Sequence, residues 1–130
     1  MKKFDYPSSC IAYSRGNGKF EIQKLPAQVQ FSSVNAALCT DLNNDGKNDV
    51  ILGGNKFDML PQFCRLDASY GNVLINNGNK NFSMLESNQS GLEVEGQVKD
   101  IKLINSKDKK YILFLRNNDY PAMYKINNSK

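Results

Sequence analysis

Histidine and tryptophan are absent from this chain of 130 residues, and cysteine occurs only three times. Without histidine the chain cannot form a Ser/His/Asp or Cys/His catalytic arrangement, and no glycine-rich phosphate loop is present. Cys10, Cys39 and Cys64 have no CxxC spacing, so we expect no zinc site. We interpret the cysteines as small buried apolar residues, and we predict that the chain is not an enzyme.

Long apolar runs are also missing, so we expect no membrane span. Residues 1–3 carry the positive charge of a secretory signal, but residues 4–9 supply no apolar core, and we expect no export signal in this chain. With 40% hydrophobic and 23% charged residues, the composition is typical of a globular domain. The net charge of +4 is mild.

The most informative stretch is the loop at residues 41–49, DLNNDGKND, which lies between two apolar runs. Oxygen-bearing groups recur along it at positions that suit a hard cation such as calcium. Three converging carboxylates would repel one another unless a cation lay between them. The predicted calcium ligands are Asp41, Asn43, Asp45, Asp49 and the backbone carbonyl of Lys47.

An ordinary solvated turn is the alternative interpretation of this loop, because Asn, Asp and Gly also dominate turns that bind nothing. An EF-hand is excluded, since that loop requires a glutamate at its twelfth position and this chain has Leu52 there. The short β-branched run that follows Asp49 predicts a strand rather than an exiting helix.

Short strands separated by turns account for most of the chain. Gly and Asn residues separate the first two strands, and again the fifth and sixth, which predicts two hairpins. The expected strands are residues 10–14, 19–25, 35–40, 49–53, 72–76, 81–85, 98–105, 111–117 and 121–126.

The two hairpins match each other at one constant offset, as in the pairs Ile11 with Val73 and Phe20 with Phe82. The same offset carries residues 50–52 onto 112–114, which indicates repeated units of about four strands, as in propeller blades. At this offset the calcium loop matches a stretch without carboxylates. We expect that stretch to form a turn that binds no ion. The equivalent residues at this offset are Leu103, Asn105, Lys107 and Tyr111.

Residues 41–52 resemble the calcium loop of FG-GAP and VCBS repeats, the blades of integrin-α-like β-propellers, and weaker similarity extends from about Ser9 to residue 119. The Phe-Gly and Gly-Ala-Pro signatures of those repeats are missing. The resemblance implies an all-β partial β-propeller with about two four-stranded antiparallel blades. Residues 1–34 would form a half blade and a connection, 35–86 a full calcium-binding blade, and 87–130 a last, incomplete blade.

The resemblance further implies an exported or cell-surface protein that acts in recognition or adhesion, or as a structural part of a larger repeat protein. Its partner would be a protein, a glycan or the missing propeller blades. In this interpretation the chain is the carboxy-terminal end of a propeller, and the calcium ion is structural.

Residues 56–68 have no counterpart in the last unit, and insertions on one face of a repeat protein often bind ligands. The residues predicted to bind a partner are Phe57, Arg65, Asp67 and Tyr70. The alternative is a loop held by an ion pair between Arg65 and Asp67 and by an apolar plug of Leu60 and Phe63.

Two other interpretations of the whole chain remain open. It could be a nucleic-acid-binding module that uses its basic surface, with Tyr111, Phe114 and Arg116 on one strand and Lys107 nearby. It could also be a truncated gene product without a separate function.

Overall fold

The computed structural model describes residues 6–60, 62 and 64–127, which form an all-β protein of three antiparallel sheets. The nine strands expected from the sequence are all present, with ends that differ by at most two residues. They are β1 (Cys10–Ser14), β2 (Phe20–Lys24), β3 (Val34–Thr40), β4 (Asp49–Gly54), β5 (Asn72–Asn76), β6 (Phe82–Leu85), β7 (Val98–Ser106), β8 (Lys109–Arg116) and β9 (Ala122–Lys125).

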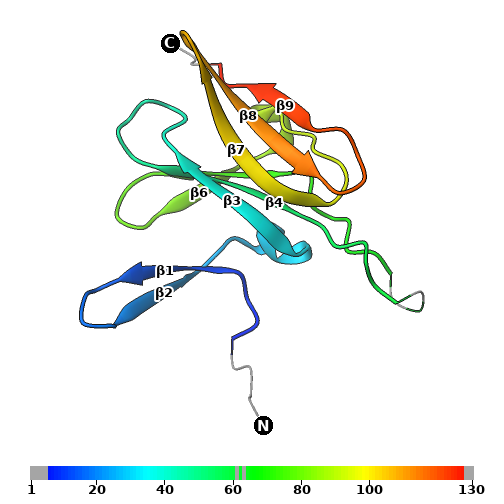
Figure 1. Cartoon of the computed structure of the whole chain (residues 1–130). Helices are drawn as coiled ribbons and strands as arrows, with labels where there is room; N and C mark the ends of the chain where they lie inside the picture. The colour runs from blue at the N-terminus through cyan, green and yellow to red at the C-terminus, as the bar shows by residue number, and fades with distance from the viewer. Residues whose placement is uncertain (1–5, 61, 63, 128–130) are drawn as a thin grey trace.

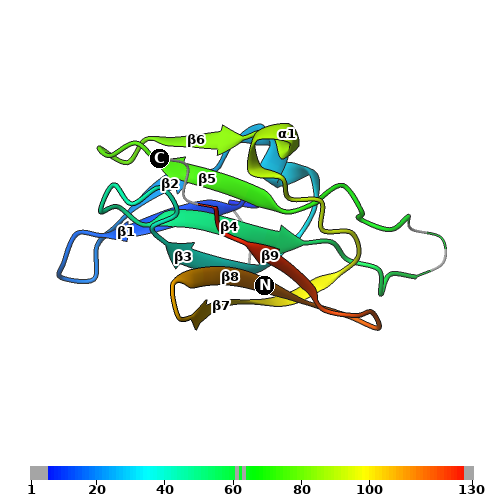
Figure 2. The same ribbon diagram turned by 90° about the horizontal axis from the view of Figure 1, so that it is seen from above.

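Every strand pairs with a sequence neighbour, in the orders β1-β2, β3-β4-β5-β6 and β7-β8-β9. The three sheets are stacked as layers, with β3–β6 between β1–β2 below and β7–β9 above (Figure 1). The strands of the middle sheet lie side by side when seen from above (Figure 2). Helical structure consists of the 3-10 turn η1 (Ala27–Phe31) and the short α1 (Ser87–Ser90), and no helix of the described residues could span a membrane.

Strand β4 is buried along its whole length because both faces of its sheet are covered. Side chains alternate between the faces of a strand, so consecutive apolar residues enter two different cores. Val50 and Leu52 pack toward β1–β2, whereas Ile51 packs toward β7–β9. Burial of each such side chain contributes about 1.5–3 kcal/mol.

The hairpins β1–β2 and β5–β6 share one turn geometry and one register. Residues 16–18 and 78–80 all have positive φ, with values of 78°, 50° and 70° in the first turn and 83°, 50° and 62° in the second. Ala12 lies opposite Ile22, and Leu74 lies opposite Met84. The two hairpins therefore pair their strands identically, at the offset that the sequence repeat predicts.

The connection from β7 to β8 is not equivalent to the calcium loop in the way the sequence predicts. β-bulges follow Val34 in β3 and Val98 in β7, so these two residues are equivalent, whereas the offset of the hairpins would match Val34 with Gly96. Leu103 pairs with Ile112 inside the hairpin, so the prediction that it occupies the place of Asp41 is wrong. The strands continue to pair as far as Ser106, and a tight turn at residues 107–108 replaces the longer loop.

Asn55 links the three segments that meet at the end of β4. It has a φ of 75°, and it is only 1% exposed. Its Oδ1 accepts hydrogen bonds from the Ser32 hydroxyl (2.8 Å) and the Ser69 N–H (2.9 Å). Its Nδ2 donates to the carbonyl oxygens of Ser69 (2.7 Å) and Gly96 (3.0 Å). The side chain thereby satisfies backbone groups that have no strand partner at this junction.

Gly53 allows the middle sheet to approach β7 closely. A Cβ at this position would lie 2.6 Å from Cγ1 of Val98 and 3.2 Å from Cδ1 of Ile101. Any larger residue would therefore push the two sheets apart.

The cysteines contradict the expectation that they are buried. Cys10, Cys39 and Cys64 are all exposed, and none forms a disulfide. Cys10 lies on the face of β1 opposite to Ile11. Cys39 pairs with Val50 and shares the face of the middle sheet that is turned toward β1–β2, but it remains exposed there.

We predict that Asn55→Ala lowers the free energy of unfolding by about 3 kcal/mol or more, because it leaves a buried N–H and two carbonyl oxygens without their partner. Urea denaturation measures this loss. Asn17→Ala is the matched control, since Asn17 also has positive φ but lies in an exposed turn. It should cost only about 1 kcal/mol. Equal losses in the two variants would show that backbone strain alone explains the effect.

Candidate functional site

The predicted calcium loop folds back on itself through its own side chains. Asp41 accepts the N–H groups of Asp45 (3.2 Å) and Gly46 (2.9 Å), and Asn43 also accepts the N–H of Asp45 (3.1 Å). Asn44 and Gly46 have φ values of 60° and 82°, which bend the chain tightly. The side-chain oxygens at the first and third loop positions thus turn toward the interior of the loop.

Asp45 is paired with Lys47 through both carboxylate oxygens. One oxygen accepts the backbone N–H of Lys47 (2.9 Å), and the other lies 2.8 Å from its ammonium nitrogen. The side-chain hydrogen bond from Lys47, followed by the backbone one, lowers the pKa of Asp45 below its usual value. The lysine ammonium therefore supplies the positive charge beside this carboxylate.

Asp49 holds the loop against the sheet. This residue is 0% exposed at the start of β4. Its two oxygens accept the N–H of Leu42 (2.9 Å) and the N–H of Asn76 (2.8 Å). Since a carboxylate can accept about four hydrogen bonds, Asp49 keeps two acceptor sites beyond these contacts.

The donor set fits calcium in its chemistry, because every predicted ligand offers oxygen. The arrangement is less complete: among the residues that the structure describes, no three acidic or cysteine side chains are gathered as a metal-binding group. The acids instead satisfy N–H groups within the loop, an N–H of β5 and the Lys47 ammonium. To bind an ion, Asp45 would have to exchange the lysine ammonium for the metal.

The described residues of the segment at 56–68, which exclude 61 and 63, form a narrow ribbon that extends away from the sheets (Figure 1). Lys56 and Leu66 form an antiparallel bridge. The backbone nitrogen of Lys56 lies 2.8 Å from the carbonyl oxygen of Leu66, and the nitrogen of Leu66 lies 3.0 Å from the carbonyl oxygen of Lys56. This register places Phe57 opposite Arg65, and the guanidinium lies 4.9 Å from the ring centroid. The structure therefore brings together two of the four residues predicted to bind a partner.

The expected ion pair between Arg65 and Asp67 is not among those formed by the described residues, because Arg65 stacks on Phe57 instead. Asp67 and Tyr70 are exposed, and within the described chain no side-chain hydrogen bond or ion pair joins them to the Phe57–Arg65 pair. The apolar plug is wrong for Leu60, which is 61% exposed. Its other predicted member, Phe63, lies outside the described residues.

Asp58 anchors the ribbon to Gln97, the residue just before β7, a contact that the sequence analysis missed. Its Oδ1 accepts a hydrogen bond from Nε2 of the buried Gln97 (2.8 Å), which also lowers the pKa of Asp58. The two residues are far apart in the chain and belong to different units, so no local pattern could have paired them.

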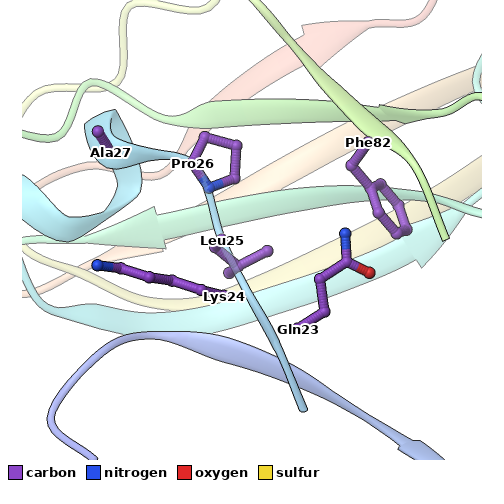
Figure 3. A pocket seen from close by; sticks show the side chains of 6 residues that line it. All are labelled: Gln23, Lys24, Leu25, Pro26, Ala27 and Phe82. Atoms are coloured by element: carbon purple, nitrogen blue, oxygen red, sulfur yellow. The ribbon is translucent and has the colours of Figure 1, made fainter. Parts of the chain in front are cut away.

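A shallow hollow of about 390 Å³ lies where β2 leads into η1. Figure 3 shows Phe82, from β6, facing Gln23 and Leu25. The lining offers apolar surface, one side-chain amide and the Lys24 ammonium. The lining residues are Gln23, Lys24, Leu25, Pro26, Ala27 and Phe82.

Two of the residues named for a stacking platform, Phe114 and Arg116, are engaged within the protein. Phe114 is 0% exposed and packs edge-on against Tyr124 at a centroid distance of 5.8 Å. Arg116 donates to the carbonyl oxygen of Tyr120 (2.8 Å) and pairs with Asp119 (2.8 Å). Phe114 therefore cannot stack on a base, and Arg116 would first have to leave its partners within the protein.

Comparisons of the chain with protein-family models, with curated proteins and with solved structures find no significant match. The loop and the stacked sheets are therefore the observations on which a function can be based.

We predict that Lys47→Gln raises the pKa of Asp45 toward its ordinary value, because it removes the ammonium that stabilises the carboxylate. A carbon-13 NMR titration of the side-chain carboxyl groups measures this shift. Lys102→Gln is the matched control, since Lys102 pairs with Asp100 at 2.9 Å. It should raise the pKa of Asp100 and leave Asp45 unchanged. An unaltered Asp45 in Lys47→Gln would contradict the assignment.

We also predict that Asp49→Asn lowers the free energy of unfolding by roughly 2–3 kcal/mol in the presence of a chelator. An amide offers one acceptor oxygen, so its NH2 group would face the N–H of Leu42 or of Asn76. Asp108→Asn, at the exposed turn between β7 and β8, should change stability by less than about 0.5 kcal/mol. Chemical denaturation measures the free energy of unfolding of both variants. Equal losses of stability would contradict the role of Asp49 in holding the loop against the sheet.

Proposed function

We propose that the chain is a non-enzymatic, calcium-stabilised segment of a β-propeller, serving recognition or adhesion or forming a structural part of a larger repeat protein. The observation that carries this proposal is the stack of three antiparallel sheets, in which two hairpins share one register at one constant offset in sequence. Repetition of a small antiparallel sheet, each packed on the next, is the arrangement of propeller blades.

Equivalent positions of neighbouring sheets also face in equivalent directions, which supports the propeller proposal. Val50 and Leu52 of β4 pack toward the sheet that precedes them in the chain. Ile112 and Phe114, their counterparts in β8 at the offset of the hairpins, likewise pack toward the sheet that precedes theirs. Each sheet thus presents one face to the unit before it, as successive blades do.

The calcium part of the proposal rests on the loop chemistry. Five oxygen donors lie within nine residues, and the loop joins two adjacent strands of one sheet. The candidate ligands are Asp41, Asn43, Asp45, Asp49 and the carbonyl of Lys47. A bound calcium ion would neutralise the acids and fix the connection between β3 and β4, a structural rather than a catalytic role.

For recognition, the exposed ribbon at residues 56–68 is the proposed surface. It presents Arg65 stacked on Phe57, together with exposed apolar side chains at Met59, Leu60 and Leu66. Apolar and arginine side chains of this kind suit a protein or glycan partner. The resemblance of residues 41–52 to FG-GAP and VCBS repeats adds an exported or cell-surface location to this proposal.

We predict that 10 mM calcium raises the melting temperature by about 5 °C, because a ligand that binds only the folded state stabilises it by mass action. The estimate assumes a dissociation constant of roughly 0.1–1 mM, as in extracellular calcium modules. Differential scanning calorimetry with calcium, with magnesium and with a chelator provides the measurement. Magnesium should give a smaller shift, and no shift with calcium would remove the metal from the proposal.

Three variants assign that shift to the loop. Asp45→Ala should abolish the shift, whereas Lys107→Ala, in the exposed turn after β7, should leave it intact. Lys47→Gln keeps the predicted backbone ligand but removes the competing ammonium, so it should bind calcium more tightly than the natural chain. Loss of the shift in Lys107→Ala would place the ion elsewhere.

A further inference from the structure

A groove of about 650 Å³ separates β1 from the middle sheet. Its walls are mainly apolar and come from two sheets. Ile11 and Tyr13 of β1 form one side, and Ala37 and Cys39 of β3 form the other, with Val50 of β4 at its base. Such a space between two layers is where further β-structure could pack.

The third sheet has a surface on β7 that is equivalent to the β3 wall of this groove, and there the surface is covered. Val98 and Ile101 of β7 are buried because β3 and β4 lie against them, with Gly53 of β4 directly over both side chains. Asn35 of β3 also donates to the carbonyl of Val98 (3.0 Å). The bulge registers make Val34 and Ala37 of β3 equivalent to Val98 and Ile101 of β7. Val34 is 36% exposed and Ala37 is also exposed, so β3 lacks the cover that it gives to β7.

The adjoining edge of β1 is also unpaired within the described part of the chain. The N–H of Arg15 donates to the carbonyl of Lys19, and the N–H of Leu25 donates to the carbonyl of Ser9. These two bonds show which residues of β1 direct their N–H and carbonyl groups toward β2. Because such pairs alternate in an antiparallel ladder, the N–H and carbonyl of Ala12 point to the free edge. The equivalent residue of β5, Leu74, uses that edge to pair with Val50 of β4.

Tyr13 provides an independent sign of an incomplete site. It lines the groove, and its hydroxyl oxygen is buried without a hydrogen-bond partner among the described residues. A buried hydroxyl without a partner is costly, and a backbone carbonyl brought into the groove could satisfy it.

We propose that the groove takes a β-hairpin from another polypeptide chain. One strand of this hairpin pairs antiparallel with β1, as β4 pairs with β5, and the two strands together cover Val34 and Ala37, as β3 and β4 cover β7. The pairing strand is apolar on both faces, like residues 50–52. This inference rests on the repeat arrangement proposed above but not on its calcium ion.

A second copy of the chain is the poorer occupant. Its own apolar strands of this kind, β4 and β8, are each paired on both sides and cannot be donated without unfolding a sheet. A separate hairpin needs no such sacrifice, and main-chain pairing at a sheet edge is an established mode of peptide recognition.

The probe is a fluorescently labelled peptide with the sequence of residues 34–54, added to the full chain in a chelator. We expect saturable binding by fluorescence anisotropy at micromolar concentration, and a change of less than about twofold between 50 and 500 mM salt, because the contacts are apolar and main-chain. The same peptide with Ile51→Asp should bind at least tenfold more weakly. No binding of the unmodified peptide at 100 µM would overturn the proposal.

Two variants of the chain locate the binding. Ala12→Pro removes the free-edge N–H, and Ala37→Lys places a charge on the exposed groove wall; each should weaken binding at least tenfold. Met123→Pro is the matched control. The hydrogen bond from Ile126 to Lys110 and the alternation of the ladder direct the N–H of Met123 toward the free edge of β9. It should bind like the natural chain.

If Ala12→Pro disturbs β1, Ala37→Lys decides the location alone, since Ala37 is exposed and makes no core contact that the fold requires. Binding that survives Ala37→Lys would overturn the proposal. Light scattering must show a monomer; a dimer dissociated by Ala37→Lys would make a second copy the occupant and overturn it as well. A calcium-dependent melting shift without peptide binding would leave the proposed calcium segment standing and reject only the hairpin site.

Discussion

The stacking of the sheets depends on how the chain leaves β4, and Asn55 controls that exit. An asparagine can adopt the left-handed conformation at a modest cost and carries both a donor and an acceptor, so one residue can reverse the chain and pair the surrounding backbone. Its partners, Ser32, Ser69 and Gly96, come from three different connections. Beside it, Gly53 removes the side chain that would keep β7 away. A polar junction and a small residue together determine where the two cores can form.

The acids of the loop before β4 divide into two roles. Asp49 is buried and bound to backbone groups on both sides, so its position is determined by the fold itself. Asp41 and Asp45 lie toward solvent, where loop N–H groups and the Lys47 ammonium stabilise their charges. A metal cation and the Lys47 ammonium could each supply the positive charge beside Asp45. They differ in the number of oxygen atoms that each can bind.

Strand positions were largely predictable, because alternation and Gly/Asn turns are local signals and the residues that carry them, such as those at 16–18, also set the turn geometry. Features that depend on register were not. The bulges after Val34 and Val98 change the offset of the repeat without any marker in composition. The stacking of Arg65 on Phe57 likewise follows from the bridge between Lys56 and Leu66 rather than from nearness in sequence. For the candidate site, the position of the loop between two strands was predictable, but the lysine partner of Asp45 and the buried state of Asp49 were not.

The pairing of every strand with a sequence neighbour has a consequence for how the protein reaches its structure. Apart from the long connection between β4 and β5 at residues 55–71, the loops within the sheets are short and close at low entropic cost, so hairpins can form before the sheets meet. We expect the slow event to be the docking of these layers, which requires Asn55 to find partners in distant connections. Mutations within a hairpin should therefore act mainly on the early rate of folding, while those between layers act on the rate at which the finished protein opens.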